Sequence, residues 1–341
     1  MKEIVISKND AGQRLDRFLK KYLSKAPLSA VYKAVRKDVK VDGVRRREDF
    51  PLEEGQTLQL YISDEQLAAW TQKPEKKRAK RQFGIVYEDD NILIANKPFG
   101  LLVHGDKSEK KDTLANQVTD YLIETGSYDP RAEKSFSPSP AHRLDRNTTG
   151  IVVFGKNAEA LRELARLFRE DGLVTKSYYT IVHGKLDEEQ HLKGKLLKDE
   201  EKNIGRVLAE DDPRGKYIET VVRPVAFSKG AYGRGRSSRG YSLADVELIT
   251  GRSHQIRAHL ASIGHPLAGD SKYGGRQLMV DGAEYVLGRS TQALHAYKVE
   301  FKAAEGALGY LCGKSFTAPL PKAWDALQAG IFGKVIIDSE R

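Results

Sequence analysis

Cysteine is almost absent from this sequence of 341 residues, in which Cys312 stands alone. A single cysteine permits no intrachain disulfide and no zinc site built from cysteines, which suits a reducing cytoplasm. No apolar run approaches the ~18 residues that a membrane-spanning helix requires. The opening letters MKEIVISKNDAG return to charged residues after three apolar ones, so we expect no signal peptide. The expected protein is cytoplasmic and binds no membrane.

The histidines do not form a metal-binding pattern. His254 and His259 are five residues apart, about 140° around a helix, so they cannot share a face as the ligands of an H-E-x-x-H motif do. His142, His265 and His295 belong to separate segments and have no carboxylate at ligand spacing beside them. We therefore expect no metal, and the sequence indicates no other cofactor.

Positive charge, by contrast, is in surplus: 57 Lys and Arg residues against 47 Asp and Glu give a net charge of +10. Such a surplus favours a polyanionic partner, bound through phosphate contacts that release counterions. A soluble protein with a lysine-rich surface would have the same total, so the placement of the charges must separate the two interpretations. The length predicts more than one domain.

Residues 1–64 have the pattern of a compact α/β unit. RLDRFLKKYL has the apolar spacing of an amphipathic helix, and a second helix begins near Ser29. VKVDGV then alternates into the turn pair Asp42-Gly43, which predicts a hairpin, and TLQLYI closes the unit as a strand. The second helix and the hairpin concentrate basic residues in a short span, namely Lys33, Arg36, Lys37, Lys40, Arg45, Arg46 and Arg47.

Solvated helix and turn faces are often basic, but this clustering beside a hairpin favours a surface that follows phosphates. The letters QRLDRFL, LSAVYKAVRKDVKVDGVRRR and LEEGQTLQLY resemble the alpha-L RNA-binding motif, first known from a small-subunit ribosomal protein. The resemblance covers about a fifth of the chain and departs from the family at Asp42, where Asn is common. It implies an RNA-binding domain at 1–64 whose contacts include Lys33, Arg36, Lys37, Arg45 and Arg46.

Residues 65–83 have the composition of a basic linker, with six Lys or Arg among the nine residues 73–81. Residues 84–341 mix strands such as GIVVFGKN, SYYTIVHG and SLADVELIT with helices such as NAEALRELARLFRE and RSHQIRAHLASIG. Because strands and helices do not alternate strictly, this segment predicts an α+β fold with a mixed, largely antiparallel central sheet and flanking helices.

The loop 228–242 combines glycine, serine, tyrosine and arginine. Its glycines are no dinucleotide fingerprint, because no strand leads in and no helix follows. We expect a flexible hairpin tip whose arginines meet phosphates, namely Arg234, Arg236 and Arg239.

The tetrapeptide RLDR occurs twice. At 143–146 it precedes the turn NTTG and an apolar strand, so Asp145 lies where a loop enters the core. Neighbouring arginines favour an ionised carboxylate, as a nucleophile or general base requires, and a structural aspartate that orients the turn is the alternative. At 14–17 the same letters lie on an amphipathic helix, where we expect Asp16 to be a solvated ion-pair partner.

Arg257 is a second candidate. It lies one turn along its predicted helix from His254, and we expect both on a polar face, opposite Ile256, Leu260 and Ile263. An arginine on a helix can be aimed rigidly at a carboxylate or a phosphate. An ordinary surface arginine is the alternative.

Tyr178 is a third candidate, because it follows Lys176 by two residues at the start of an apolar strand. An aromatic ring beside a cation suits a platform on which a nucleic-acid base stacks. A core tyrosine with a satisfied hydroxyl is the alternative.

All three candidates belong to longer motifs. AHRLDRNTTGIVVFGKN resembles the H-R-L-D-x-x-T-S-G signature of the RluA-type pseudouridine synthases, and TGRSHQIRAHLASIGHPLAGDSKYGG resembles their second signature. ILIANKPFGLLVH, KSYYTIVHG and LHAYKVEF match further blocks in family order, so the resemblance spans nearly all of 84–325. Thr149 replaces the usual serine, and the loop 228–242 is longer than in the family.

The resemblance implies the pseudouridine synthase fold and a cofactor-free isomerisation of uridine in RNA. Asp145 would be the catalytic aspartate, Arg257 would pair with it, and Tyr178 would stack on the target base. Arg143 would fill the gap left by a flipped-out uridine, because the glycosidic bond is unreachable inside a base stack. Further scaffold or RNA contacts would come from His142, Lys97, Lys176, Arg252 and His254.

An alpha-L domain before such a catalytic domain favours large-subunit ribosomal RNA, or a ribosome assembly intermediate, as the partner of a monomeric enzyme. A synthase acting on tRNA is one alternative. A non-catalytic assembly factor is another, although intact Asp145, Tyr178 and Arg257 argue against it. A glycosylase is disfavoured because no water-activating partner has a clear spacing from Asp145.

Overall fold

The structure is a computed structural model that describes residues 1–71, 80–106, 109, 111–199, 201–228, 240–274 and 291–338. The chain divides into two compact units: Met1–Arg81 with Asn116–Ser139 and Gly155–Arg162, and Gln82–Ala115 with Pro140–Phe154 and Glu163–Arg341. The domain boundaries at 64 and 83 remain a prediction. Within the described ranges, no helix has both the length and the apolar character to cross a membrane.

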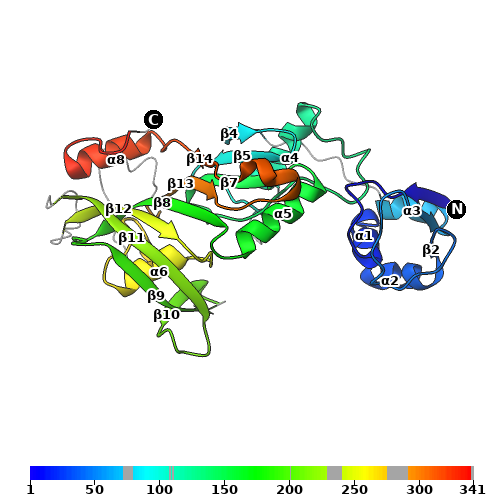
Figure 1. Cartoon of the computed structure of the whole chain (residues 1–341), viewed down its shortest axis with the longest axis horizontal. Coiled ribbons are helices and arrows are strands. Elements are labelled where there is room, and N and C mark those ends of the chain that lie inside the picture. The colour runs from blue at the N-terminus through cyan, green and yellow to red at the C-terminus, as the bar shows by residue number, and fades with distance from the viewer. Residues whose placement is uncertain are drawn as a thin grey trace. The chain divides into compact units, whose positions relative to one another are not determined.

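The amino-terminal segment forms a small antiparallel sheet of order β1-β3-β2 with helices packed on it (Figure 1). Its elements are β1 (Lys2–Val5), α1 (Leu15–Tyr22), α2 (Leu28–Lys37), β2 (Val39–Val41), β3 (Thr57–Leu60) and α3 (Asp64–Thr71). The apolar positions that predicted the first helix, Leu15, Phe18 and Leu19, are fully buried in this core. α3 occupies the start of the expected linker, because Leu67 joins the same core.

The expectation that Asp16 is solvated was wrong. Its side chain is only 6% exposed, and it accepts hydrogen bonds from Arg14 Nε at 3.0 Å and Lys20 Nζ at 3.2 Å. Burial opposes ionisation, yet these hydrogen bonds lower the pKa of Asp16 below its ordinary value. A loop distant in the sequence accounts for the burial of Asp16. The backbone N–H of Asp16 donates to the carbonyl of Glu48, so this loop covers a helix face that the apolar spacing predicted to be exposed to solvent.

The second unit is built on a large sheet of order β10-β9-β11-β12-β8-β13-β7-β5-β4, with β14 beside β13 and β6 beside β7. β13 and β7 are parallel, whereas the pairs from β10 to β13 and the pair β4–β5 are antiparallel. The prediction of a mixed, largely antiparallel sheet is therefore confirmed. The strands are β4 (Gly84–Glu88), β5 (Ile92–Lys97), β6 (Ser139–Pro140), β7 (Thr149–Gly155), β8 (Val174–His183), β9 (Gln190–Asp199), β10 (Ile204–Leu208), β11 (Lys216–Ser228), β12 (Tyr241–Leu248), β13 (Leu294–Phe301) and β14 (Ser315–Thr317).

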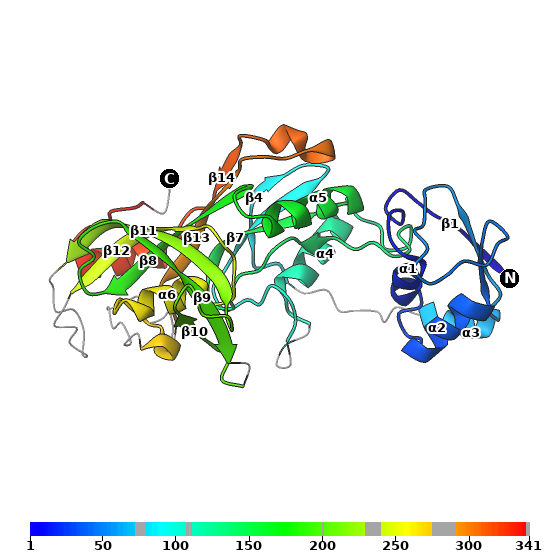
Figure 2. The same cartoon turned by 60° about the horizontal axis from the view of Figure 1, so that its bottom comes forward.

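Helices cover both faces of the long strands, which run side by side in Figures 1 and 2. On one face Ala258 of α6 packs on Ile218 of β11, and on the other Trp324 of α8 packs with Ile181 of β8. Tyr178 shares the α6 face, because strand residues alternate between faces and Tyr178 pairs with Val246. In the described residues the remaining helices are α4 (Leu114–Glu124), α5 (Ala158–Arg169), α6 (Gln255–Ser262), α8 (Ala323–Phe332) and the 3₁₀ turns η1 (Ser271–Tyr273) and η2 (Gly306–Leu311).

α6 does not have the polar face that its sequence predicted. Every residue from Gln255 to Leu260 is buried, including Arg257 at 5% exposure, whereas Ile263 is 37% exposed. A helix that is covered on all sides has no solvated stripe, so apolar spacing cannot orient it. The position of Arg257 inside the protein is the first structural sign that this arginine is not a surface cation.

The expected loop 228–242 lies mostly outside the described residues. Its two arms are present, because Ser228 at the end of β11 pairs with Tyr241 at the start of β12. The tip with Arg234, Arg236 and Arg239 falls outside the described ranges.

Candidate active site

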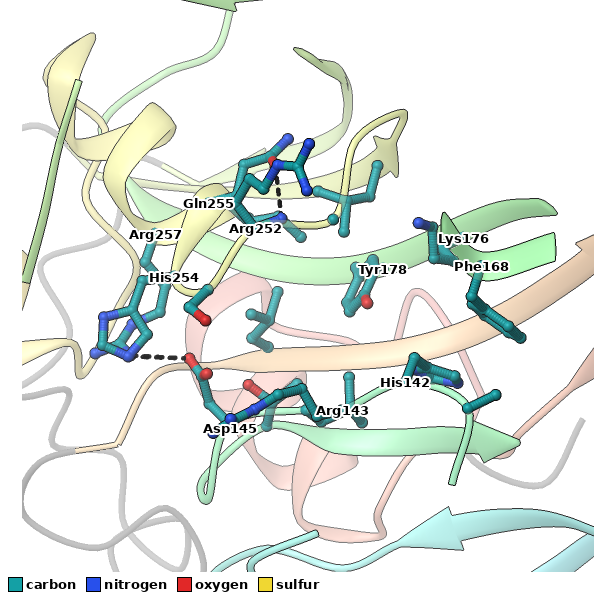
Figure 3. Close-up of a pocket in the computed structure, with 18 of the residues that line it drawn as sticks. His142, Arg143, Asp145, Phe168, Lys176, Tyr178, Arg252, His254, Gln255 and Arg257 are labelled. Atoms are coloured by element: carbon teal, nitrogen blue, oxygen red, sulfur yellow. Dashed lines mark hydrogen bonds and ion pairs between the residues drawn. The ribbon is translucent and has the colours of Figure 1, made fainter. Parts of the chain in front are cut away.

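A cavity of about 320 Å³ opens on the α6 face of the sheet. Asp145, His254 and Arg257 stand on one side of it, His142, Phe168 and Lys176 on the other, and Tyr178 between them (Figure 3). The lining comes from the loop before β7, from α5, from β8 and from the loop that leads into α6. Segments more than a hundred residues apart thus meet around one space large enough for a small ligand.

The loop that carries Asp145 is closed by a turn in which the Thr148 N–H donates to the carbonyl of Asp145 at 3.1 Å. Gly150 follows with a φ of +107°, and a Cβ there would lie 2.1 Å from the carbonyl oxygen of Ala296. No other residue permits β7 to pass so close to β13. The glycine of the NTTG turn therefore fixes where the Asp145 loop ends.

Of the two roles that the resemblance allowed for Lys97, a scaffold contact or an RNA contact, its position inside the protein fits the scaffold. It is fully buried at the end of β5, and its ammonium donates to the carbonyl oxygens of Pro98, Leu101 and Arg146 at 3.0, 2.8 and 2.8 Å. Burial lowers the pKa of Lys97 to about 7, against the opposing effect of the Asp145 charge. With all three protons bound inside the protein, Lys97 ties β5 to the residue that follows Asp145.

Arg257 binds two carboxylates at once. Its Nη1 donates to Asp145 Oδ2 at 3.0 Å, while Nε and Nη2 donate to Asp270 Oδ2 and Oδ1 at 2.6 and 2.8 Å. The Arg257 and Asp270 side chains are 6% and 1% exposed. A bidentate pair fixes the plane of a guanidinium, so the remaining donor is aimed at Asp145.

The two carboxylate oxygens of Asp145 have different surroundings. Oδ2 receives the bond from Arg257 and faces Nε2 of His254 at 3.6 Å. No residue in the described part of the chain donates a hydrogen bond to Oδ1. Because the side chain lines the cavity and is 22% exposed, one oxygen is held by the protein and the other is available to a ligand.

His254 stands beside this carboxylate in an unusual backbone conformation, with a φ of 62° just before α6. Its Nδ1 is 3.0 Å from the hydroxyl oxygen of Tyr273, which also accepts the backbone N–H of Gly205 at 2.6 Å. Burial lowers the pKa of His254, although the charge of Asp145 opposes this effect. The imidazole is therefore neutral near pH 7.

Tyr178 presents its ring to the cavity from β8 and is 6% exposed. Burial raises the pKa of its hydroxyl, and the Asp145 charge raises it further, so the phenol stays protonated. In the described residues, no hydrogen-bond partner binds this hydroxyl. The ring is thus free to contact a ligand in the cavity.

Four cations that form no ion pair within 4 Å in the described part of the chain surround the same space: Arg143, Arg169, Lys176 and Arg252. Burial lowers the pKa of Lys176. His142 also lines the cavity, but its Nε2 accepts the backbone N–H of Val153 at 3.2 Å, and its ring stacks on Phe168 with centroids 4.3 Å apart. Arg143, Arg169 and Arg252 are exposed and Lys176 is partly buried, so this group of cations favours an anionic ligand here.

The structure thus brings together eight of the residues singled out in 84–341: His142, Arg143, Asp145, Lys176, Tyr178, Arg252, His254 and Arg257. The five basic residues of the amino-terminal segment, Lys33, Arg36, Lys37, Arg45 and Arg46, are exposed on their own unit. Asp270 and Tyr273 were missed. Both stand in GDSKYGG, within the second signature, but nothing in local spacing relates them to Arg257 or His254.

Residues 91–262 match the model of a family described as RNA pseudouridylate synthase. The chain belongs to this family. The synthase is 34% identical to the "Ribosomal large subunit pseudouridine synthase C" of Vibrio cholerae over 310 residues, which cover 87% of this chain and 88% of that one. It is 32% identical to the Escherichia coli K12 protein of the same name over 314 residues, with 88% of each chain covered.

The synthase also shares its fold with the solved "Human RNA Pseudouridylate Synthase Domain Containing 4", with a TM-score of 0.54, 22% identity, and coverage of 73% of this chain and 93% of that one. The predicted family and fold are therefore confirmed, and the synthase is an enzyme that acts on RNA. The alpha-L assignment of residues 1–64 remains a prediction.

Proposed function

We propose that this synthase converts specific uridines of large-subunit ribosomal RNA to pseudouridine, with Asp145 as the catalytic carboxylate. The substrate class is supported by the two relatives named as ribosomal large subunit pseudouridine synthases, whose similarity extends over nearly the whole chain. The observation that carries the role of Asp145 is its asymmetry: Oδ2 is held by Arg257, whereas Oδ1 accepts no hydrogen bond from the described residues, on a side chain that lines the cavity.

The chemistry of the isomerisation fits such a site. The bond between N1 of uracil and C1′ of ribose breaks, a bond between C5 and C1′ forms, C5 loses a proton and N1 ends with one. Atoms and electrons balance without water, a metal or a redox carrier, so a single oriented carboxylate suffices to start the exchange. Arg257 holds the Asp145 carboxylate in a fixed orientation through the contact at 3.0 Å.

The base has to leave the RNA stack before Asp145 can reach the glycosidic bond. Tyr178 supplies a ring between the two sides of the cavity on which the flipped uracil stacks. Arg143 is exposed next to Asp145, which suits a side chain that fills the gap left in the RNA. Lys176 and Arg252 are unpaired cations at the cavity and are assigned to RNA contacts, whereas His142 and His254 shape the cavity wall.

The amino-terminal unit is assigned to RNA binding. Its exposed basic residues, Lys33, Arg36, Lys37, Arg45 and Arg46, lie on or just after α2, and the charge they contribute supports attraction to phosphates. The enzyme is taken to act as a monomer in the cytoplasm on ribosomal RNA or on an assembly intermediate.

The role of Asp145 is tested by the release of tritium from RNA that carries [5-³H]uridine. Asp145→Asn keeps the size of the side chain but removes its charge, so we expect loss of tritium release with RNA binding retained. Asp90→Asn, in the exposed turn between β4 and β5, is the matched control and should behave as the wild type. Full turnover by Asp145→Asn would refute the assignment.

A further inference from the structure

Tyr273 does not line the cavity, yet it contacts both of the side chains that face Asp145. Its hydroxyl oxygen is 3.0 Å from Nδ1 of His254, and its ring centroid is 5.1 Å from the guanidinium carbon of Arg257. The rings of Tyr273 and His254 meet edge to face, at 85°. Tyr273 follows Asp270, the bidentate partner of Arg257, by one turn of η1. The segment 270–273 therefore contacts Arg257 and His254, the two residues that face Asp145.

The hydrogen bonds of Tyr273 select one tautomer of His254. The Tyr273 oxygen already accepts the N–H of Gly205 at 2.6 Å, which favours Nδ1 of His254 as the acceptor of the Tyr273 proton over a second N–H at the same oxygen, and we assign the proton in this way. The imidazole proton is then on Nε2, which faces Oδ2 of Asp145 at 3.6 Å. The other tautomer would turn a lone pair toward the carboxylate, which is electrostatically unfavourable.

The backbone of His254 agrees with a fixed role for this ring. Its φ of 62° lies in the left-handed region, where residues other than glycine are uncommon and persist only when their surroundings hold them. The His254 side chain is 11% exposed and lies between Tyr273 and Asp145. The ring is thus constrained from both sides.

We propose that Tyr273 is a positioning residue for the isomerisation: by fixing the tautomer of His254, it gives Asp145 Oδ2 an N–H partner in addition to Arg257 and leaves Oδ1 directed at the uridine. The proposal rests on the proposed function, because it concerns Asp145 as the catalytic carboxylate. Tyr273 itself touches neither the cavity nor the reacting atoms and acts through His254.

The tautomer can be measured in the wild-type protein. Nitrogen-15 NMR of the histidine side chains, with His254 assigned by comparison with His254→Ala, distinguishes a proton on Nε2 from one on Nδ1. We expect the Nε2–H form near neutral pH in the wild type and a mixture of tautomers in Tyr273→Phe. A proton on Nδ1 in the wild type would overturn the proposal, and this measurement needs no variant of Tyr273 to fold.

Kinetics test whether the tautomer matters. Tyr273→Phe removes one hydroxyl and keeps the ring beneath Arg257, so we expect kcat to fall about 10-fold to 100-fold, as for other outer partners of active-site groups, with KM for RNA unchanged. His254→Ala should lower kcat by a similar factor. Because Tyr273 acts through His254, adding Tyr273→Phe to His254→Ala should cause no further loss.

The controls separate this proposal from structural damage and from failure of the proposed function. Tyr87→Phe also removes a hydroxyl that bonds a side chain, that of Asp89, but on β4, and should retain wild-type kcat. Wild-type kcat in Tyr273→Phe, or effects of Tyr273→Phe and His254→Ala that multiply, would refute the role of Tyr273. Asp145→Asn in the same assay tests the proposed function independently, since the result expected for this variant is the same whichever tautomer His254 has.

Discussion

At the scale of the residue, the contrast between Asp16 and Asp145 shows what identical letters leave undetermined. Both follow an Arg-Leu pair and both meet an arginine, Arg14 at 3.0 Å and Arg257 at 3.0 Å. Both carboxylate oxygens of Asp16 accept hydrogen bonds, from Arg14 and Lys20, whereas Oδ1 of Asp145 accepts none from the described residues. The availability of one carboxylate oxygen, rather than the contact with an arginine, distinguishes the candidate catalytic group.

Asp270 gives a prediction at this scale. Asp270→Asn would set an amide N–H against one of the guanidinium donors of Arg257 and would leave a buried cation with less compensation. Removing one partner of such a pair costs about 3 kcal/mol of unfolding free energy. We also expect kcat to fall at least about 10-fold, because Nη1 loses its aim at Asp145. Urea unfolding and tritium release measure the two effects.

Asp212→Asn is the matched control for this variant. Asp212 also forms a bidentate pair, with Arg214 at 3.0 and 2.7 Å, but the arginine is 65% exposed at the surface. Exposed pairs contribute little, so stability and turnover should remain close to those of the wild type. Wild-type turnover in Asp270→Asn would show that Arg257 needs no partner beyond Asp145.

The sequence identified Asp145, Tyr178 and Arg257 through motifs that the structure brings around one cavity, although their roles remain proposals. It could not identify Asp270 and Tyr273 as their partners. Both meet Arg257 and His254 only because η1 folds back beneath α6, and a contact set by tertiary packing leaves no periodic signal in the chain. For the same reason the sequence could not decide between a scaffold role and an RNA contact for Lys97, because local sequence does not separate a buried lysine from an exposed one.

At the scale of the element, the sequence predicted well those strands and helices that have one solvent-exposed face. β12 alternates as SLADVELIT suggested, with Val246 and Leu248 buried and Glu247 intermediate. The turn at Asp42-Gly43 also forms, with positive φ at both residues, but β2 pairs with β3 across the longer connection 42–56. α6 was misjudged because it is covered all round, so its Arg257 is buried beside Ile256 and Ala258.

No local sequence pattern predicted the order of the strands in the sheet. β13 pairs in parallel with β7, which precedes it by more than a hundred residues, and this pairing places His295 opposite Thr149. β13 can lie beside β7 only because Gly150 has no side chain where the backbone of Ala296 approaches it. One glycine in a turn motif does not indicate which strand will lie beside it. The sequence therefore predicted a largely antiparallel sheet but not the order of its strands.

At the scale of the whole molecule, buried histidines make stability depend on pH. Burial lowers the pKa of both His259 and His295 to about 4, and these side chains are 2% and 0% exposed. In the unfolded chain the same imidazoles take up a proton near the ordinary value of about 6.5. Between these values the unfolded state binds more protons, so acidification favours unfolding.

We therefore expect the unfolding free energy to be unaffected by these two groups above about pH 6.5 and to fall as the pH drops toward about 4. Their joint contribution to the slope approaches roughly 3 kcal/mol per pH unit in this window. Urea unfolding across the range measures it. His259→Asn should make the curve shallower by about half of that slope, and an unchanged slope would contradict the account.

The central claim, that this synthase modifies uridines of large-subunit ribosomal RNA through Asp145, is tested most directly by mapping pseudouridine across total RNA. Cells that lack the chain would be compared with the same cells supplied with the wild type or with Asp145→Asn. We predict that specific pseudouridines in large-subunit ribosomal RNA disappear without the chain and return only with the wild type. Unchanged ribosomal RNA, with the losses confined to tRNA, or full restoration by Asp145→Asn would contradict the claim.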